Sequence, residues 1–459
     1  MHLRHLRLLD FRSWPLLELE LEPGMTTLVG RNGHGKTNVL EAVGVLSTLR
    51  SHRVASDAPM IRTGAQTALV GALAHNAGRE LTVELALNSG KANRARLNTS
   101  PCRRLGDILG VVQSVLFAPE DLALVRGEPA ERRRLLDELM SQRRPALGGD
   151  IADYSAVLRQ RNALLKSASG ALRRGRPEES AAVLDTLDVW DGRLASIGAR
   201  IVSGRVALLE QLRPLVVDAY RTLAPESRPA DLTYRFRVAS PPAESDLADP
   251  EFVEALLLAE LGSRRREEIE RGQSLVGPHR DDLVLTLGDE PAKGFASHGE
   301  TWSFALALRL GSLELFRADG IEPVLLLDDV FAELDRHRRA ALADVAAGVE
   351  QVLITAAVGE DVPSGLRGAR HDVVMTGEGS DRHSGITLSP HRSNGDTVDQ
   401  GEGFADGGSG AVAPAPVRAG DDEDDEGDDD NDNGNNENGN NDDDNNDTDN
   451  TDSTSGVQL

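Results

Sequence analysis

The chain has 459 residues, a net charge of −25 at pH 7 and a single cysteine, Cys102. This length suffices for two or three domains, one cysteine excludes an intramolecular disulfide, and no run of about 18 apolar residues is present to span a membrane. The start of the chain is too interrupted by charge for a secretory signal, so we expect a cytoplasmic protein without a membrane partner.

Strands are expected first along the chain. Residues 17–21 alternate leucine with glutamate, as in a half-buried strand, and residues 26–29 form a short, apolar, partly β-branched run. Similar runs predict strands at 68–74, 81–87, 95–98 and 111–117, with Asn88-Ser89-Gly90 as a hairpin turn.

A phosphate-binding loop lies between the strand at 26–29 and a helix predicted at 37–49. It has the pattern G-x-x-x-x-G-K-T, here Gly30-Arg31-Asn32-Gly33-His34-Gly35-Lys36-Thr37. Such a loop aims backbone N–H groups and the positive end of the helix at one place, which suits a polyphosphate. We expect Lys36 to reach the β- and γ-phosphates of ATP and the Thr37 hydroxyl to ligate Mg²⁺.

A mostly helical segment is predicted at 129–224. Its apolar stripe from Leu187 to Ile201 predicts packing within the domain, and Gly204 and Pro214 are expected to interrupt the helix beyond it. A strand and a helix then follow, at 232–237 and 252–270.

An α/β pattern resumes near Leu283. The predicted order is helix, strand, helix, strand, at 300–316, 324–327, 335–345 and 351–355. One α/β domain is therefore expected to be split by a helical insertion.

Two carboxylates, Asp328 and Asp329, follow the aliphatic run at 324–327. In phosphate-loop proteins a strand beside the loop carries an aspartate that holds Mg²⁺. We expect Asp328 to hold the metal and Asp329 to orient or deprotonate the attacking water.

Ser297 and Gly299 stand at the start of the helix predicted at 300–316. A hydroxyl, free N–H groups and the helix dipole make this either an ordinary N-cap or a second phosphate-binding surface. Two such surfaces in one chain predict an ATP-dependent homodimer, in which each surface contacts the nucleotide held by the other subunit. Asp335, just past the metal-binding strand, is expected to meet the partner.

The end of the chain is strongly acidic. From Asp396 to Leu459 there are 21 acidic residues and one basic residue, Arg418, so the first 395 residues carry a net charge of only −5. This end has almost no apolar side chains to offset its ordering entropy, and we expect it to be disordered. It is either a solvating tail or a mimic of nucleic-acid charge that competes for a basic face of the protein.

Several motifs, in this order, resemble the RecF family of bacterial recombination mediators, over residue 1 to about 377. The motifs are Asp10-Phe11-Arg12, Pro119-Glu120-Asp121-Leu122, Gly127-Glu128-Pro129, Gln160-Arg161-Asn162-Ala163-Leu164-Leu165-Lys166 and Gly277-Pro278-His279-Arg280-Asp281-Asp282-Leu283. The resemblance implies an α/β fold: a P-loop ABC-type ATPase head, SMC/Rad50-like, with an inserted helical arm and a disordered acidic C-terminal tail. The implied parts are the head at 1–125 and 273–392, the arm (lobe II) at 126–272 and the tail at 393–459.

The resemblance also implies an activity. Members of the family are weak ATPases that dimerise on ATP, bind duplex DNA and junctions with single-stranded gaps, and assist RecA loading together with RecO and RecR. This implies a role at the nucleoid, in DNA replication, recombinational repair of DNA damage and the SOS response.

Residue roles carry over from the family motifs. Lys36 and Asp329 are the implied catalytic residues, and Asp329 is shorter than the usual glutamate, which fits slow hydrolysis. The other implied roles are nucleotide binding by the loop Gly30–Thr37 and by Arg12, Mg²⁺ binding by Thr37 and Asp328, the signature motif acting in trans at Ser297 and Gly299, and the D-loop at Asp335.

Some positions depart from the family pattern. His298 and Glu300 stand where glutamine is frequent, and a Glu300 carboxylate would repel a γ-phosphate unless it faces away. Thr355 takes the place of the switch histidine of many ABC proteins. Either Gln113 or Glu120 is expected to be the Q-loop residue.

Arginine clusters are the expected DNA contacts, because the arginine fork suits phosphate oxygens. Acidic neighbours make solvated ion pairs the alternative. Because no aromatic residues are interleaved, we expect sequence-independent binding with a steep salt dependence. The clusters are at 132–134, 143–144, 159–161, 173–176 and 264–266.

Two other functions remain open. The same head fold serves as the ATPase subunit of membrane transporters, although the helical insertion is long and arginine-rich for that role. The third possibility is a non-catalytic scaffold that nucleotide merely stabilises, which the aspartate at position 329 leaves open.

Overall fold

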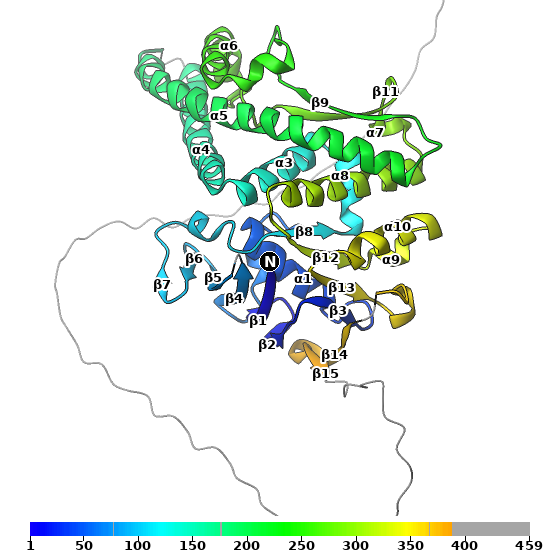
Figure 1. Cartoon of the computed structure of the whole chain (residues 1–459). Helices are drawn as coiled ribbons and strands as arrows, with labels where there is room; N and C mark the ends of the chain where they lie inside the picture. The colour runs from blue at the N-terminus through cyan, green and yellow to red at the C-terminus, as the bar shows by residue number, and fades with distance from the viewer. Residues whose placement is uncertain (77, 175–176, 367, 388–459) are drawn as a thin grey trace, which may run out of the picture. The chain divides into compact units, whose positions relative to one another are not determined.

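The structure, a computed structural model, describes residues 1–387 apart from 77, 175–176 and 367 (Figure 1). These residues belong to one compact unit, 1–392. The predicted acidic tail at 393–459 lies outside the described residues. None of the helices within the described part is long and apolar enough to cross a membrane.

A six-stranded sheet in the order β15-β14-β3-β13-β12-β8 forms the base for the phosphate loop. All neighbours in it pair in parallel except β15, which is antiparallel to β14. Parallel strands bring their carboxyl ends to one edge, so β3, β12 and β13 deliver the residues that follow them to the same place. The strands are β3 (Gly24–Val29), β8 (Ser114–Phe117), β12 (Val324–Asp328), β13 (Gln351–Ala356), β14 (Ala369–Thr376) and β15 (His383–Thr387).

A second six-stranded sheet, in the order β2-β1-β4-β5-β6-β7, is antiparallel throughout. The predicted strands in this region are confirmed, whereas β1 and β7 had no prediction. The strands are β1 (His2–Phe11), β2 (Trp14–Glu20), β4 (Thr67–Asn76), β5 (Arg79–Asn88), β6 (Arg94–Leu97) and β7 (Ser100–Pro101). A third sheet, β11-β10-β9, consists of β9 (Ala230–Arg235), β10 (Asp282–Leu287) and β11 (Glu290–Pro291).

Helices form the inserted arm and flank the sheets (Figure 1). The arm contains α3 (Pro129–Arg143), α4 (Pro145–Arg173), α5 (Pro177–Leu223) and α6 (Pro250–Arg271). The other helices are α1 (Lys36–Thr48), α2 (Leu122–Arg126), α7 (Ala292–Phe295), α8 (His298–Ala318), α9 (Val330–Glu333) and α10 (Arg336–Ala347).

The prediction that Gly204 and Pro214 interrupt the helix is wrong, because α5 continues through both. Pro214 removes one backbone hydrogen bond, but Leu212 and Val216 on either side of it are fully buried and hold the helix to its neighbours. Gly204 allows close approach, since a Cβ there would lie 3.1 Å from Met140 Sδ. Tertiary packing therefore outweighs the local preference of both residues.

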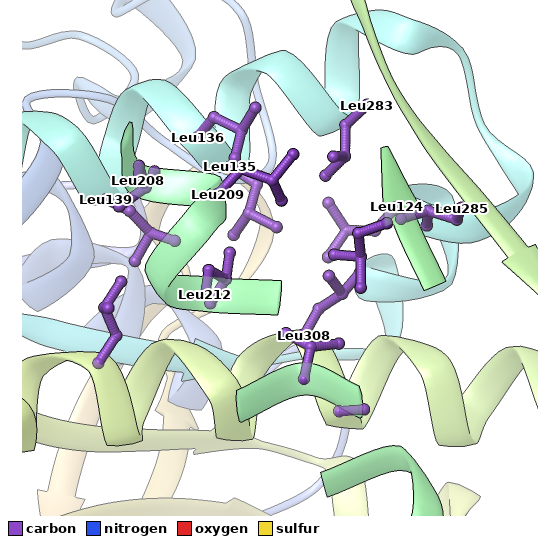
Figure 2. Close-up of a cluster of buried hydrophobic side chains, with 14 of the residues drawn as sticks. Leu124, Leu135, Leu136, Leu139, Leu208, Leu209, Leu212, Leu283, Leu285 and Leu308 are labelled. Atoms are coloured by element: carbon purple, nitrogen blue, oxygen red, sulfur yellow. The ribbon is translucent and has the colours of Figure 1, made fainter. Parts of the chain in front are cut away.

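One hydrophobic core joins the arm to the head. Figure 2 shows leucines from α2, α3, α5, β10 and α8 packed together: Leu124, Leu135, Leu136, Leu139, Leu208, Leu209, Leu212, Leu283, Leu285 and Leu308. The helix α8, which begins at the predicted signature motif, therefore packs against the arm through this shared core.

A half-buried imidazole, that of His279, lies at the junction of arm and head. Nδ1 of His279 is 2.8 Å from the hydroxyl of Tyr154 on α4, and Nε2 is 3.3 Å from the carbonyl oxygen of Ser274. Burial lowers the pKa of His279 to about 4, and the nearby cations Arg280, Arg133 and Arg161 lower it further, against the hydrogen bond that the imidazole donates to the carbonyl oxygen of Ser274. The unfolded chain therefore takes up a proton at this residue first as the pH falls.

We predict that His279→Gln makes the protein less sensitive to acid. Between pH 7 and pH 5 the free energy of unfolding of the wild type should fall by about 2 kcal/mol more than that of the variant. Urea titrations at both pH values measure this difference. The exposed His337 provides the control, since His337→Gln should keep the pH dependence of the wild type. An unchanged pH dependence in His279→Gln would contradict the prediction.

Candidate nucleotide-binding site

The phosphate loop connects β3 to α1, as predicted. Gly33 and Gly35 have φ of 82° and 97°, values that side chains disfavour, and Gly35 is the N-cap of α1. The Lys36 side chain is buried and donates to the carbonyl oxygen of Gly30 at 2.8 Å. The loop therefore encloses the ammonium group, and the first N–H groups of α1 stay available for an anion.

The β14–β15 hairpin and Trp14, at the start of β2, support this loop through hydrogen bonds. The Ser384 hydroxyl on β15 donates to the carbonyl oxygen of His34 at 2.6 Å, and Nδ1 of His34 is 3.1 Å from the carbonyl oxygen of Val373 on β14. Nε1 of Trp14 donates to the carbonyl oxygen of Gly35 at 3.0 Å. Sequence reasoning missed these residues, because no local motif marks a serine or tryptophan as a support for a distant loop.

Asp328 lies at the carboxyl end of β12, next to the loop. It accepts hydrogen bonds from the hydroxyls of Thr37 at 2.9 Å and Thr355 at 2.6 Å. Burial raises the pKa of Asp328 to about 6, against the two hydroxyl hydrogen bonds, and the negative charges of Asp329 and Glu120 raise it further. A buried carboxylate surrounded by negative charge is a site that favours a cation.

Asp329 follows in a left-handed conformation with φ 47°. Its N–H donates to the Thr355 hydroxyl at 2.8 Å, and Oδ2 lies 3.8 Å from Nζ of Lys36. The other oxygen, Oδ1, is buried and has no hydrogen-bond partner among the described residues. A buried carboxylate oxygen without a partner is costly unless water or a ligand reaches it.

These residues fit a magnesium–nucleotide complex. Among the described residues no group of three or more His, Cys, Asp or Glu side chains is arranged to hold a metal alone. Mg²⁺ usually takes one or two protein ligands and completes its octahedron with phosphate oxygens and waters. Thr37 and Asp328 are already 2.9 Å apart and would supply such a pair.

Thr355, predicted as the switch residue, is buried at the end of β13 and uses its hydroxyl twice. It donates to Asp328 and accepts from the N–H of Asp329. Its hydroxyl thus joins the Asp328 carboxylate to the backbone of Asp329. A contact between Thr355 and the nucleotide remains a prediction.

The two Q-loop candidates lie at opposite ends of β8. Gln113 precedes the strand, is buried, and donates to the carbonyl oxygen of Gln142 at 3.1 Å. Because β8 runs parallel to β12, this position is at the amino end, away from Asp328, and the geometry disfavours Gln113 as the Q-loop residue. Glu120 follows the carboxyl end, is exposed, and contributes to the pKa shift of Asp328. Of the two, Glu120 is the residue at the phosphate edge.

Arg12, predicted to bind nucleotide, is engaged within the protein. Its guanidinium donates to both carboxylate oxygens of the buried Glu41 on α1, at 2.9 and 2.5 Å, and to the carbonyl oxygen of Pro59 at 2.9 Å. The Arg12–Glu41 pair attaches the end of β1 to the helix that carries the phosphate loop. In this state Arg12 supports the site, and a direct contact with nucleotide remains a prediction.

Ser297 is the N-cap of α8, and its hydroxyl accepts from the N–H of Glu300 at 3.2 Å. The Glu300 carboxylate accepts in return from the N–H of Ser297 at 2.9 Å and from the Ser227 hydroxyl at 2.9 Å, and Arg228 lies within 3.3 Å. These contacts lower the pKa of Glu300 to about 2, the hydrogen bond from the Ser297 N–H most. Glu300 thus faces the segment between α5 and β9, and its effect on a γ-phosphate remains a prediction.

Gly299 and Asp335 are neighbours. Asp335 is the N-cap of α10, accepts from the N–H of Arg338 at 3.0 Å and forms an ion pair with its side chain. A Cβ on Gly299 would lie 3.0 Å from the Arg338 guanidinium. The predicted signature and D-loop residues are therefore close together. Within the described residues no hydrogen bond or ion pair joins 297–299 to the phosphate loop.

Most of the arginine clusters are ion-paired, which supports the alternative of intramolecular pairs for them. Arg144 and Arg159 stay exposed, and the side chains of Arg173 and Arg176 lie outside the described residues. The pairs are Arg132 with Asp282, Arg134 with Glu131 and Glu138, Arg143 with Asp319, Arg161 with Asp191 and Glu268, Arg264 with Glu267, Arg265 with Asp188 and Asp191, and Arg266 with Glu270.

Known proteins resemble this chain over most of its length. Residues 2–363 match the family described as the RecF/RecN/SMC N terminal domain. The chain is 57% identical over 395 residues to the DNA replication and repair protein RecF of Rhodococcus erythropolis, a match that covers 84% of this chain and 97% of the relative.

Two solved structures of the recombination mediator protein RecF in the RecFOR pathway, described as RecF-ATPrS and RecF-ATP, have the same fold. Their TM-scores are 0.72 and 0.71 at 25% identity, and the matches cover 84% of this chain and 98% and 97% of theirs. The predicted SMC-like ATPase head is confirmed, and the chain belongs to the RecF family.

Proposed function

We propose that this protein is an ATP-dependent DNA-binding protein of DNA replication and recombinational repair. It binds Mg–ATP, dimerises through the nucleotide, binds duplex DNA and junctions with single-stranded gaps at the nucleoid, and hydrolyses ATP slowly to release it. With RecO and RecR it assists the loading of RecA. The observation that carries the proposal is the 57% identity to a DNA replication and repair protein over 97% of that protein's length.

The separation of the two phosphate-binding surfaces supports the dimer. The phosphate loop and Asp328 lie at one edge of the central sheet, whereas Ser297 and Gly299 begin a helix with no hydrogen bond to that loop among the described residues. A second copy brings its Ser297 and Gly299 to the terminal phosphate. ATP then joins two subunits, and its hydrolysis separates them.

The chemistry follows from four side chains. Lys36 neutralises charge on the β- and γ-phosphates, and Thr37 and Asp328 hold Mg²⁺, which supplies further charge neutralisation when bound. Asp329 presents its unpartnered Oδ1 to the attacking water and accepts the proton. Because an aspartate is one methylene shorter than the usual glutamate, its reach to the water is less favourable, and we expect weak ATPase activity.

The two alternatives, a transporter subunit and a nucleotide-stabilised scaffold, are less well supported. The relatives are named for DNA replication, repair and recombination, and no observation favours a transporter. The Asp329 carboxylate supports a catalytic site over a scaffold, because its Oδ1 has no hydrogen-bond partner among the described residues and its Oδ2 lies 3.8 Å from Nζ of Lys36.

We predict that DNA binding requires ATP and weakens steeply with salt. In a fluorescence binding assay on a gapped duplex, the affinity with ATP should exceed that without nucleotide by about tenfold or more, since two linked subunits bind one DNA. Between 50 and 200 mM salt it should fall by at least about tenfold, because counterions are released from each contacted phosphate. A variant that lacks 396–459, measured in parallel, tests whether the acidic tail competes with DNA.

Two outcomes would contradict the proposal. Equal affinity for DNA with and without ATP would show that DNA binding does not depend on nucleotide. No detectable binding to gapped or uninterrupted duplex would show that the protein does not act on DNA. Equal affinity with and without residues 396–459 would end only the tail hypothesis.

A further inference from the structure

Two hollows border the phosphate loop, and they share one residue, Arg382. The first, of about 500 Å³, is lined by the loop residues 31–34 together with Met375 and Arg382. The second, of about 380 Å³, is lined by Arg12, Ser13, Asn38, Arg53, Pro59, Ile61, Arg62, Thr63 and Arg382. Arg382 precedes β15, beyond the residues 2–363 that match the family.

The backbone that carries Arg382 is fixed to the loop. The N–H of Ser384 donates to the carbonyl oxygen of Ser13 at 2.8 Å, and its hydroxyl donates to the carbonyl oxygen of His34 at 2.6 Å. β14, on the other side of the hairpin, pairs with β3, the strand that leads into the loop. Arg382 therefore has a defined position at the rim of the loop.

The guanidinium of Arg382 is exposed and makes no hydrogen bond or ion pair within the described part of the chain. Nearby arginines differ. Arg12 and Arg53 contact Glu41, and Arg370 in the same hairpin pairs with Asp372 at 2.8 Å. Arg382 thus keeps its full donor capacity for a ligand.

The loop indicates the orientation of a bound nucleotide. The buried ammonium of Lys36 and the Thr37–Asp328 pair mark the terminal phosphates and the metal. Asn38, the next residue along α1, lines the second hollow. A nucleotide whose phosphates fill the loop and whose nucleoside end passes Asn38 would enter the second hollow, and Arg382, which lines both hollows, would then lie beside its phosphates.

We propose that Arg382 is a nucleotide-binding residue whose guanidinium donates hydrogen bonds to phosphate oxygens of ATP bound in the loop. The inference rests on the proposed function, because it needs the loop to hold ATP. It makes the β14–β15 hairpin part of the nucleotide site as well as a brace. A planar arginine fork suits bidentate contact with phosphate.

The test is calorimetric titration of the full-length protein with ATP and Mg²⁺, at low and at physiological salt. Arg382→Ala should weaken ATP binding about tenfold at low salt, Arg382→Glu more, and Arg382→Lys less than Arg382→Ala. The loss should shrink as salt increases, because an exposed charge contact is screened. A purely structural role of Arg382 would give the same loss at both salt concentrations.

Arg370→Ala is the matched control, since Arg370 lies in the same hairpin and is paired, and it should bind ATP like the wild type. Thermal unfolding without nucleotide should be the same for all these variants. ATP affinity of Arg382→Ala and Arg382→Glu within twofold of the wild type would overturn the inference. If Lys36→Ala also bound ATP normally, the proposed nucleotide site itself would fail, which separates the two failures.

Discussion

Lys36→Ala should abolish both ATP binding and ATP-dependent dimerisation. The ammonium of Lys36 is buried within the loop, 2.8 Å from the carbonyl oxygen of Gly30 and 3.8 Å from a carboxylate oxygen of Asp329. Without it the loop loses the ammonium that contacts the triphosphate and faces the carboxylates of Asp328 and Asp329, so a polyanion is held less tightly. We expect ATP affinity to fall by a factor of about 100 or more, which corresponds to roughly 3 kcal/mol.

Calorimetric titration with Mg–ATP measures the first effect, and sedimentation equilibrium with and without ATP measures the second. Lys91→Ala is the control, since Lys91 is exposed in the segment between β5 and β6 and should behave as wild type. If Lys36→Ala dimerised with ATP like the wild type, neither the loop nor the nucleotide would be the link between subunits.

The phosphate loop and the position of Asp328 beside it were predictable because each depends on consecutive residues. The turn from β3 into α1 needs glycine at Gly33 and Gly35, and an aliphatic strand that ends in a carboxylate defines Asp328. Parallel pairing then brings both to one edge without further information. Strands such as β4, β5, β12 and β13 were predictable because hydrophobic periodicity is local, whereas β1, β7, β14 and β15 had no prediction.

Long-range partners were not predictable in this way. Ser384 supports His34 across most of the chain, and Arg12 and Glu41 form a buried pair that neither motif indicates. The choice between Gln113 and Glu120 depended on the direction of β8, which a sequence pattern does not contain. The arginine clusters appeared basic because their acidic partners often come from distant segments, such as Asp282 for Arg132.

Glu300 illustrates both the local sequence pattern and the long-range contacts. In the sequence it is a departure from the family pattern, and in the structure its carboxylate joins the N–H of Ser297 to Ser227 and Arg228 at the end of the arm. The hydroxyl of Ser227 also lies 2.9 Å from that of Tyr220 on α5. The start of α8 is therefore fixed to the end of the arm by these contacts.

Ser297→Arg should leave ATP binding intact and block ATP-dependent dimerisation. Ser297 makes no hydrogen bond to the phosphate loop of its own chain among the described residues, so the loss falls only on the contact with a second subunit. The long side chain occupies the space that the partner's terminal phosphate needs. We expect the dimer association constant to fall at least about 100-fold, or roughly 2.7 kcal/mol.

Two further variants separate this effect from the lost helix cap. Ser297→Asp retains a good N-cap but places a negative charge against the partner's triphosphate, and it should also block dimerisation. Ser263→Arg, at an exposed serine on α6, should dimerise normally. Sedimentation equilibrium with ATP measures all three, and calorimetry verifies that each still binds ATP. If Ser297→Arg and Ser297→Asp both dimerised like the wild type, Ser297 would be an ordinary helix cap, and the terminal phosphate would be held by one subunit alone.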